Sequence, residues 1–388
     1  MAGHLETLNP MKFLSLSEKR QNAVLAASGE IKEHSANKLA KSLHPSCQHM
    51  KISKIIDRGE NCKSFVLVPD EERGTQKCAY FSAGQYLSVT VEIDGIKYSR
   101  PYTISSSPSD SVNGYYMITV KAFPNGKISN YIIKTWNEGT RVDVSEPMGT
   151  FTYEPLRDEK HIIGIAGGSG ITPFISLAKA ISEGDEDCSL TLIYGCRKEK
   201  DILFKRELGD LATKCDRIRV VYVLSEECKS NYEHGLISAR LIKKYAPTVP
   251  YSVFVCGPDA LHNYVAEELL AFDLEKKHVR HELHGTNYSL KEAPVSVCID
   301  VICQGERYTV KGDSKTTILE SLEQGGIVPP SRCRSGECGF CRSRLISGMV
   351  YTPEDKDRRR RADDPYGYIH PCCTYPMENI EIEIGSNQ

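Results

Sequence analysis

The chain has 388 residues, enough for two or three domains that each bury a core of their own. Its 49 lysines and arginines nearly balance 51 aspartates and glutamates, and this formal net charge of -2 gives no reason to expect nucleic acid or an anionic membrane as a partner. No stretch reaches the roughly 20 apolar residues of a membrane helix and the first residues lack the apolar core of a signal peptide, so we expect a cytoplasmic protein.

The first part of the chain divides into two patterns. Residues 1–47 have a helix-favouring composition up to a break at Pro45, and we expect a helical extension of unknown role. Residues 48–155 change to short alternating runs such as KISKII and YLSVTVEI, separated by Gly, Asn, Asp and Pro turns. This spacing predicts a small antiparallel β-barrel.

The rest of the chain changes pattern twice more. Residues 156–285 alternate apolar strands such as HIIGIA and LTLIYG with helical stretches, which is typical of a parallel sheet covered by helices. Residues 286–293 are mostly polar and lie between Gly285 and Pro294, so we predict a linker there. Residues 294–388 begin with a predicted hairpin and the helix TTILESLEQGG, and the cysteine loop follows.

The cysteines carry the strongest signal. Most of the fifteen are scattered singly through apolar contexts, which favours free thiols in a reducing compartment. The exception is a C-x4-C-x2-C run at Cys333, Cys338 and Cys341, followed about thirty residues later by Cys372 and Cys373. Four thiolates on a glycine-containing loop and one distant segment suit an iron-sulfur cluster. A structural zinc site is the alternative, but its second half usually brings another C-x2-C pair, which is missing here.

Residues 294–388 resemble a plant-type [2Fe-2S] ferredoxin, including the element Cys372-x-x-Tyr375-Pro376. The resemblance implies an α+β domain of the β-grasp type that carries one electron at a time. It also implies that the metal ligands are Cys333, Cys338, Cys341 and Cys372. Cys373 is then expected to point away from the cluster, although an exchange of roles with Cys372 stays open.

A flavin site is expected on the barrel. Arg100-Pro101-Tyr102-Thr103 resembles the R-x-Y-[ST] element of the ferredoxin-NADP reductase superfamily, and the flanking AGQYL and EPMGTF segments follow that family's order. The resemblance implies that Arg100 neutralises flavin phosphate, that the Tyr102 ring lies against the isoalloxazine, and that the Thr103 hydroxyl reaches N5. A second phosphate-binding segment is expected at Gly126, Lys127, Ile128 and Ser129, which favours FAD over FMN.

A nicotinamide site is expected on the parallel sheet. The turn GGSGITP follows an apolar strand, opens a helix and resembles the same superfamily's dinucleotide element. The implied contacts are Gly167, Gly168, Ser169, Gly170 and Thr172. Cys256, Gly257 and Pro258 are expected beside the nicotinamide ring and Arg197 at the adenosine end, with Lys198 as a possible 2′-phosphate ligand. The choice between NADH and NADPH stays open.

The order of modules resembles the reductase components of multicomponent oxygenases. It implies an NAD(P)H:acceptor reductase in which hydride reaches FAD and single electrons pass through the [2Fe-2S] cluster to a partner metalloprotein, an oxygenase component or another terminal acceptor. The residues predicted to be catalytic are Tyr102, Thr103 and Cys256, acting by positioning rather than as an acid-base pair.

Two other functions remain open at this stage. One is a redox-sensing or assembly protein that keeps the folds without turnover. The other is the electron-transfer subunit of another flavoenzyme, which the long gap before Cys372 disfavours. The run Arg358 to Arg361 is predicted to be a solvated, locally paired loop, with a docking patch for an acidic acceptor as the alternative.

Overall fold

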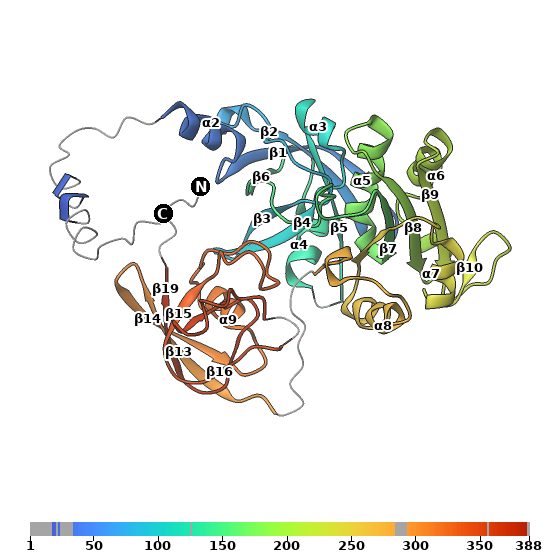
Figure 1. Cartoon of the computed structure of the whole chain (residues 1–388). Coiled ribbons are helices and arrows are strands. Elements are labelled where there is room, and N and C mark those ends of the chain that lie inside the picture. The colour runs from blue at the N-terminus through green and yellow to red at the C-terminus, as the bar shows by residue number, and fades with distance from the viewer. Residues whose placement is uncertain are drawn as a thin grey trace, which may run out of the picture. The chain divides into compact units, whose positions relative to one another are not determined.

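The computed structural model describes residues 18–20, 22–23, 34–124, 126–283, 293–354 and 357–385. It divides into two units, residues 1–43 and residues 44–388. The first contains helical residues at 18–20 and 22–23 and the helix α2 (Ser35–Leu43). The predicted linker, apart from its last residue, lies outside the described residues. The second unit contains three large sheets (Figure 1).

The first sheet is antiparallel, with strand order β4-β3-β6-β1-β2-β5. A backbone bridge between Ile104 and Ile118 joins its two edges, so the sheet curls into the predicted barrel. Apolar side chains alternate with polar ones along the strands, so one face of the sheet is apolar and forms the core of the barrel. The short helix α4 packs Ile128 and Ile132 against this core. The elements are β1 (Gln48–Asp57), β2 (Cys62–Pro69), β3 (Tyr86–Ile93), β4 (Ile96–Thr103), α3 (Pro108–Val112), β5 (Tyr116–Lys121), α4 (Lys127–Thr135) and β6 (Arg141–Val144).

The second sheet is wholly parallel, in the order β10-β9-β8-β7-β11-β12. Its central strands are apolar on both faces because α5 and α6 pack on one face and α7 and α8 on the other. The predicted helix-covered parallel sheet is therefore confirmed. The elements are β7 (His161–Gly167), α5 (Thr172–Glu183), β8 (Ser189–Cys196), α6 (Lys205–Lys214), β9 (Ile218–Leu224), β10 (Glu233–His234), α7 (Ala239–Tyr245), β11 (Ser252–Cys256), α8 (Asp259–Leu269) and β12 (Val279–Glu282).

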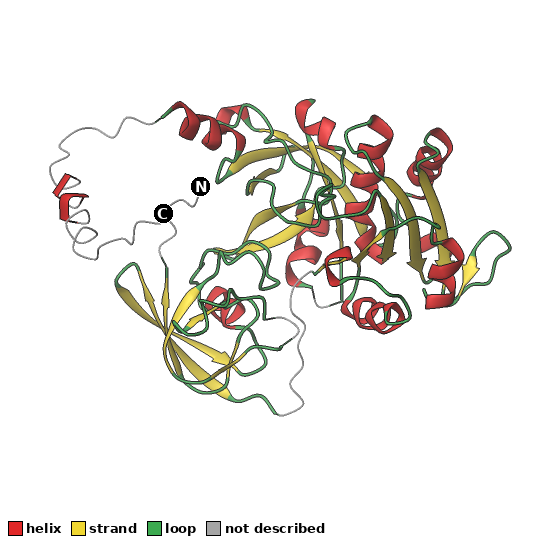
Figure 2. Cartoon of the chain, in the orientation of Figure 1, coloured by secondary structure: helices red, strands yellow, loops and turns green. Residues whose placement is uncertain are grey.

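The third sheet is mixed, in the order β14-β13-β19-β15-β17, and packs against α9. Ile318 and Leu322 of α9 are fully buried against this sheet, as expected for a β-grasp domain. Figure 2 distinguishes this strand-rich part from the helix-covered parallel sheet. The elements are β13 (Ser296–Cys303), β14 (Glu306–Asp313), α9 (Ile318–Gln324), β15 (Ser343–Ser347), β16 (Val350–Tyr351), β17 (Tyr368–Ile369), β18 (Tyr375–Pro376) and β19 (Ile380–Ile384).

Aromatic packing joins the barrel to the parallel sheet. Phe151, which follows the barrel strands, lies 5.9 Å from Phe174 of α5 and 5.1 Å from Phe254 of β11, measured between ring centroids. Only glycine fits at position 84 beside this Phe151 wedge, because a Cβ there would lie 2.0 Å from the Phe151 carbonyl oxygen. The backbone at Gly84 also has a φ of +100°, which other residues rarely adopt. One apolar cluster thus joins barrel residues such as Met117 to the parallel sheet, while the main core of the barrel forms a cluster of its own.

None of the helices in the described residues combines the length and the apolar character needed to cross a bilayer.

Candidate electron-transfer site

Four cysteine thiols meet between the loop after α9 and the segment before β18. The Cys333 side chain interacts directly with those of Cys338 and Cys372, and Cys341 interacts with Cys372. The backbone N–H groups of Ser335 and Cys338 also point at Cys333 Sγ, with N···S distances of 3.4 and 3.3 Å. Such N–H groups stabilise a thiolate. The donor set therefore fits the predicted iron-sulfur cluster.

The fifth cysteine of the region, Cys373, is fully buried. Its thiol donates to the His370 carbonyl oxygen at 3.4 Å, although its side chain also interacts with that of Cys372. His370 in turn uses Nδ1 to contact the Gly336 carbonyl oxygen at 2.7 Å, which ties the two halves of the site together. The predicted assignment of the fourth ligand to Cys372 is consistent with this geometry.

Glu323 of α9 joins the cluster loop to the barrel. It is 1% exposed and accepts two hydrogen bonds from Arg334 of the cluster loop, at 2.6 and 3.1 Å. Arg100 of β4 approaches the same carboxylate at 3.3 Å. Burial and the neighbouring Arg334 lower the pKa of Arg100, and Glu323 opposes that shift. Two guanidinium groups from different modules thus share one buried carboxylate.

The predicted flavin residues lie along β4 and at the start of α4. The Thr103 hydroxyl is buried without a hydrogen-bond partner, so it is available to a ligand. The Tyr102 side chain packs against the barrel core. Lys127 donates from Nζ to the Tyr98 hydroxyl at 2.6 Å and lies over that ring, which places the first residue of α4 beside β4. Gly126 is the N-cap of α4, whose free amides, including those of Ile128 and Ser129, suit a phosphate.

The two predicted nicotinamide segments touch. A Cβ on Gly170 would lie 2.3 Å from the Cys256 carbonyl oxygen, and one on Gly257 would lie 3.2 Å from the Gly167 nitrogen. Glycine at these positions therefore lets the turn approach the end of β11. The turn itself comprises Gly168, Ser169 and Thr172 in addition to the glycines named, and Pro258 follows as the N-cap of α8.

A buried acidic residue lies beside Cys256 in the parallel sheet. Cys256 pairs with Glu282 across β11 and β12, and both side chains are buried. Burial raises the pKa of Glu282 well above its usual range, and the charges of Glu337 and Cys333 raise it further. The pKa of Tyr86 is likewise raised, first by burial and then by Cys333. The charge of the cluster loop thus influences one residue of the parallel sheet and one residue of the barrel.

Arg197 lies apart from this region. Its side chain is 79% exposed after β8 and approaches Glu226 at 3.7 Å, and Lys198 approaches the same carboxylate at 3.9 Å. Both residues follow β8, which is separated from β11 and Cys256 by β7 in the sheet, and their place at the adenosine end stays a prediction.

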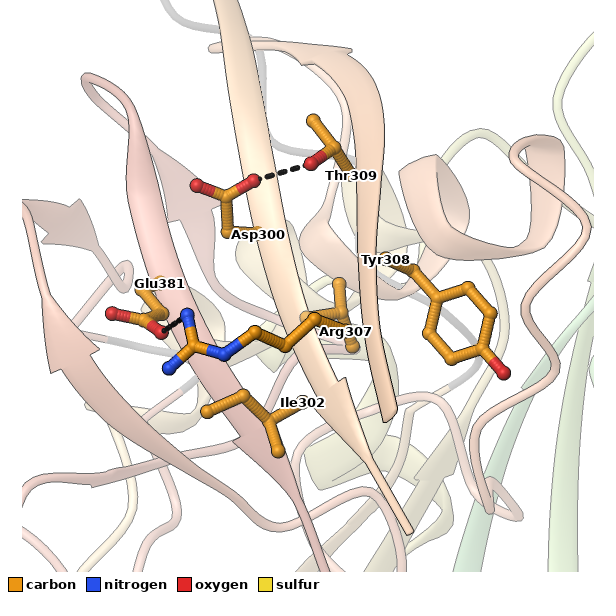
Figure 3. A pocket seen from close by; sticks show the side chains of 7 residues that line it. Asp300, Ile302, Arg307, Tyr308, Thr309 and Glu381 are labelled. Carbon is orange, nitrogen blue, oxygen red and sulfur yellow. Dashed lines mark hydrogen bonds and ion pairs between the residues drawn. The ribbon is translucent and has the colours of Figure 1, made fainter. Parts of the chain in front are cut away.

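Two other features of the described residues have the makings of a site. A hollow of about 230 Å³ on β13, β14 and β19 is crossed by an ion pair between Arg307 and Glu381 at 2.8 Å (Figure 3). Elsewhere Cys47, His49 and Asp143 have potential metal-ligand atoms within 4.8 Å of one another. Both oxygens of Asp143 already accept hydrogen bonds from Arg73, so a cation would have to displace that guanidinium.

Sequence reasoning missed the residues that connect the modules. Glu323 lies in a helix, where an acidic residue is ordinarily solvated, and Arg334 lies between Cys333 and Cys338, where an arginine is ordinarily exposed as well. One signal in the sequence could have indicated that Glu323 is buried. Its spacing from Leu319 and Leu322 places it on the same face of the helix α9 as these apolar residues.

Comparisons with known families follow the same three modules. Residues 50–153 match the oxidoreductase FAD-binding domain, residues 165–267 the oxidoreductase NAD-binding domain, and residues 301–377 the 2Fe-2S iron-sulfur cluster binding domain.

Several relatives match this chain over most of their length. The ferredoxin reductase component of 3-ketosteroid-9-alpha-monooxygenase from Rhodococcus rhodochrous is 30% identical over 351 residues, which cover 86% of this chain and 95% of that protein. This chain belongs to the same family of flavin and [2Fe-2S] reductases. The reductase subunit of glycine betaine monooxygenase from Pseudomonas aeruginosa is 27% identical to our reductase over 350 residues, covering 85% and 93% of the two chains. The reductase is thus an NAD(P)H-dependent oxidoreductase that uses FAD and a [2Fe-2S] cluster.

The fold agrees with this assignment. The solved structure of phthalate dioxygenase reductase superposes with a TM-score of 0.65 at 24% identity, covering 87% of this reductase and 98% of that chain. The multi-domain fold predicted from the sequence is confirmed.

The cysteine assignment predicts which thiols hold iron. Replacing Cys333, Cys338, Cys341 or Cys372 singly by serine removes one of four thiolates, so we expect loss of most bound iron and of the visible cluster absorbance. Cys373→Ser is the matched control, since it changes a neighbouring buried thiol, and should keep at least about half the iron. Iron loss in Cys373→Ser with retention in Cys372→Ser would exchange the two roles.

The shared carboxylate predicts a large stability effect. Glu323→Gln leaves two guanidinium groups without their charge partner, and breaking a buried pair typically costs about 3–5 kcal/mol. We expect the cluster absorbance to be lost at a clearly lower guanidinium chloride concentration. Glu320→Gln, at an exposed position of the same helix, should change the unfolding free energy by less than about 0.5 kcal/mol. Equal shifts in the two variants would show that Glu323 contributes no special interaction.

Proposed function

We propose that this reductase is the electron-supplying component of a multicomponent oxygenase system. It takes hydride from NADH and delivers single electrons to a partner oxygenase component. The observation that supports this most is the buried Glu323, which joins Arg334 of the cluster loop to Arg100 of the barrel, because electron transfer requires the redox sites to lie close together. The relatives described above carry oxygenase reductase names.

The chain's own residues would hold and orient the cofactors. Bound FAD takes up two electrons with hydride and releases them singly, and a [2Fe-2S] cluster on the four thiols carries one at a time. Arg100 and the amides at the start of α4 would bind phosphate, while the unpartnered Thr103 hydroxyl would fix the ring edge. The turn with Gly170 would hold the dinucleotide against Cys256, whose pKa is raised by burial, so that it stays a neutral thiol.

The preference for NADH rests on Glu226. Its carboxylate lies 3.7 and 3.9 Å from the two cations that would otherwise attract a 2′-phosphate, Arg197 and Lys198. An acidic group at this end of a dinucleotide site accepts hydrogen bonds from ribose hydroxyls and repels a phosphate. A cytoplasmic location is part of the same proposal, since the fifteen cysteines, all within the described residues, form no disulfide, and a reducing compartment would keep the thiols outside the cluster reduced.

The proposal is tested by anaerobic reduction of the holoprotein. After one equivalent of NADH we expect the flavin absorbance to bleach first and the rhombic electron paramagnetic resonance signal of a reduced [2Fe-2S] cluster to follow. NADPH should give the same changes more slowly. A protein that contains flavin and iron but is reduced by neither nucleotide would refute the proposal.

Glu226 predicts a change in nucleotide preference. Glu226→Gln removes the negative charge beside Arg197 and Lys198, so kcat/KM for NADPH should rise about threefold to tenfold, while that for NADH changes little or falls. Glu227→Gln, the neighbouring acid, is the control. An unchanged ratio of the two kcat/KM values would remove Glu226 from the specificity argument.

A further inference from the structure

The cluster-bearing part of the reductase has two oppositely charged regions. Between Arg332 and Asp364 the sequence has nine lysines and arginines against six acids, whereas the remainder of residues 293–385 has three cations against eight acids. The positive region contains the cluster loop. Because the chain as a whole is nearly neutral, this asymmetry is local.

Specific contacts place the positive residues beside the cluster ligands. Arg358 pairs at 3.2 Å with Glu337, which directly precedes the proposed ligand Cys338. Arg342, which directly follows the proposed ligand Cys341, pairs with Asp363 at 2.7 Å. The loop from Asp357 to Tyr366 is therefore held against the rim of the cluster loop from two sides.

Some arginines of the cluster loop and of the loop from Asp357 to Tyr366 have acidic partners, and others do not. Arg358, Arg359 and Arg342 are balanced by local acids. No acidic partner is found within the described part of the chain for Arg344, Arg360 or Arg361. Arg360 and Arg361 are exposed.

A hollow continues this surface. Arg342 and Arg344 line an open depression of about 640 Å³ together with Gly339 of the cluster loop and Tyr368. The Arg342 guanidinium stacks on Tyr368, with its central carbon 3.5 Å from the ring centroid, so it is held in position. Tyr366 is 71% exposed at the edge of the same loop. Exposed arginine and tyrosine side chains are enriched in protein interfaces.

We propose that this arginine rim, residues 342, 344, 358, 360 and 361, is the surface on which the electron acceptor docks, and that the acceptor is a protein with an acidic face around its own redox centre. The inference rests on the proposed function, because it names the chemistry of the partner. Rim charges mainly steer encounter and so raise the association rate. Docking here places the acceptor at the cluster rather than at the flavin.

The test compares Arg360→Gln/Arg361→Gln with a control of equal charge change, Arg206→Gln/Arg240→Gln, on the exposed surfaces of α6 and α7. Acidic cytochrome b5 serves as the probe acceptor, and basic cytochrome c as its opposite. The NADH-dependent reduction of ferricyanide and the NADH-reduced cluster signal report on the reductase itself and should be unchanged in both variants.

At low salt we expect the rim variant to reduce cytochrome b5 about tenfold more slowly than the parent, and the parent rate to fall steeply with ionic strength. The control variant should behave as the parent, and cytochrome c reduction should not slow in the rim variant. Equal loss in both variants, or a cytochrome b5 rate independent of salt, would overturn the proposal. So would a rim variant that loses binding to phosphatidylserine vesicles or an oligonucleotide while keeping its cytochrome b5 rate. Loss of the cluster signal itself would instead indicate failure of the proposed function.

Discussion

A single buried carboxylate holds together the parts of this reductase that must exchange electrons. Glu323 is buried on α9, between Arg334 of the cluster loop and Arg100 of the barrel. A carboxylate in such a place is stable only when its charge is compensated, and two guanidinium groups provide that compensation. Separating the carboxylate from the two guanidinium groups would cost free energy, so the cluster loop stays against the strand that carries the proposed flavin residues. The position of the cluster relative to the flavin site therefore depends on this interaction.

Apolar packing supports the same arrangement on the nucleotide side. The Phe151 wedge joins the barrel to α5 and β11, and the close approach of Gly170 to Cys256 joins the dinucleotide turn to the same strand. Both contacts converge on β11, which pairs with the strand bearing Glu282. Hydride and electron transfer need little beyond such positioning.

The sequence was sufficient to predict each module but not their contacts. Short-range patterns revealed the alternating strands of the barrel, the apolar strands of the parallel sheet and the cysteine spacing, because these depend on local periodicity and ligand geometry. Short elements such as α7 and β12 were missed because they carry too few residues to show a period. The pairing of Glu323 with Arg100 joins positions far apart in the chain, and no local pattern encodes it. The arginine rim could be predicted only in part. The sequence shows its positive charge but not its position beside the cluster loop.

The central claim is that electrons pass from flavin to cluster within one chain, across the contact made by Glu323. Stopped-flow absorbance of the cluster after mixing with excess NADH, repeated over a tenfold range of reductase concentration, tests it directly. We predict a first-order cluster reduction whose rate constant does not change with reductase concentration. A rate constant that rises in proportion to reductase concentration would mean that electrons pass between molecules, and would contradict the account.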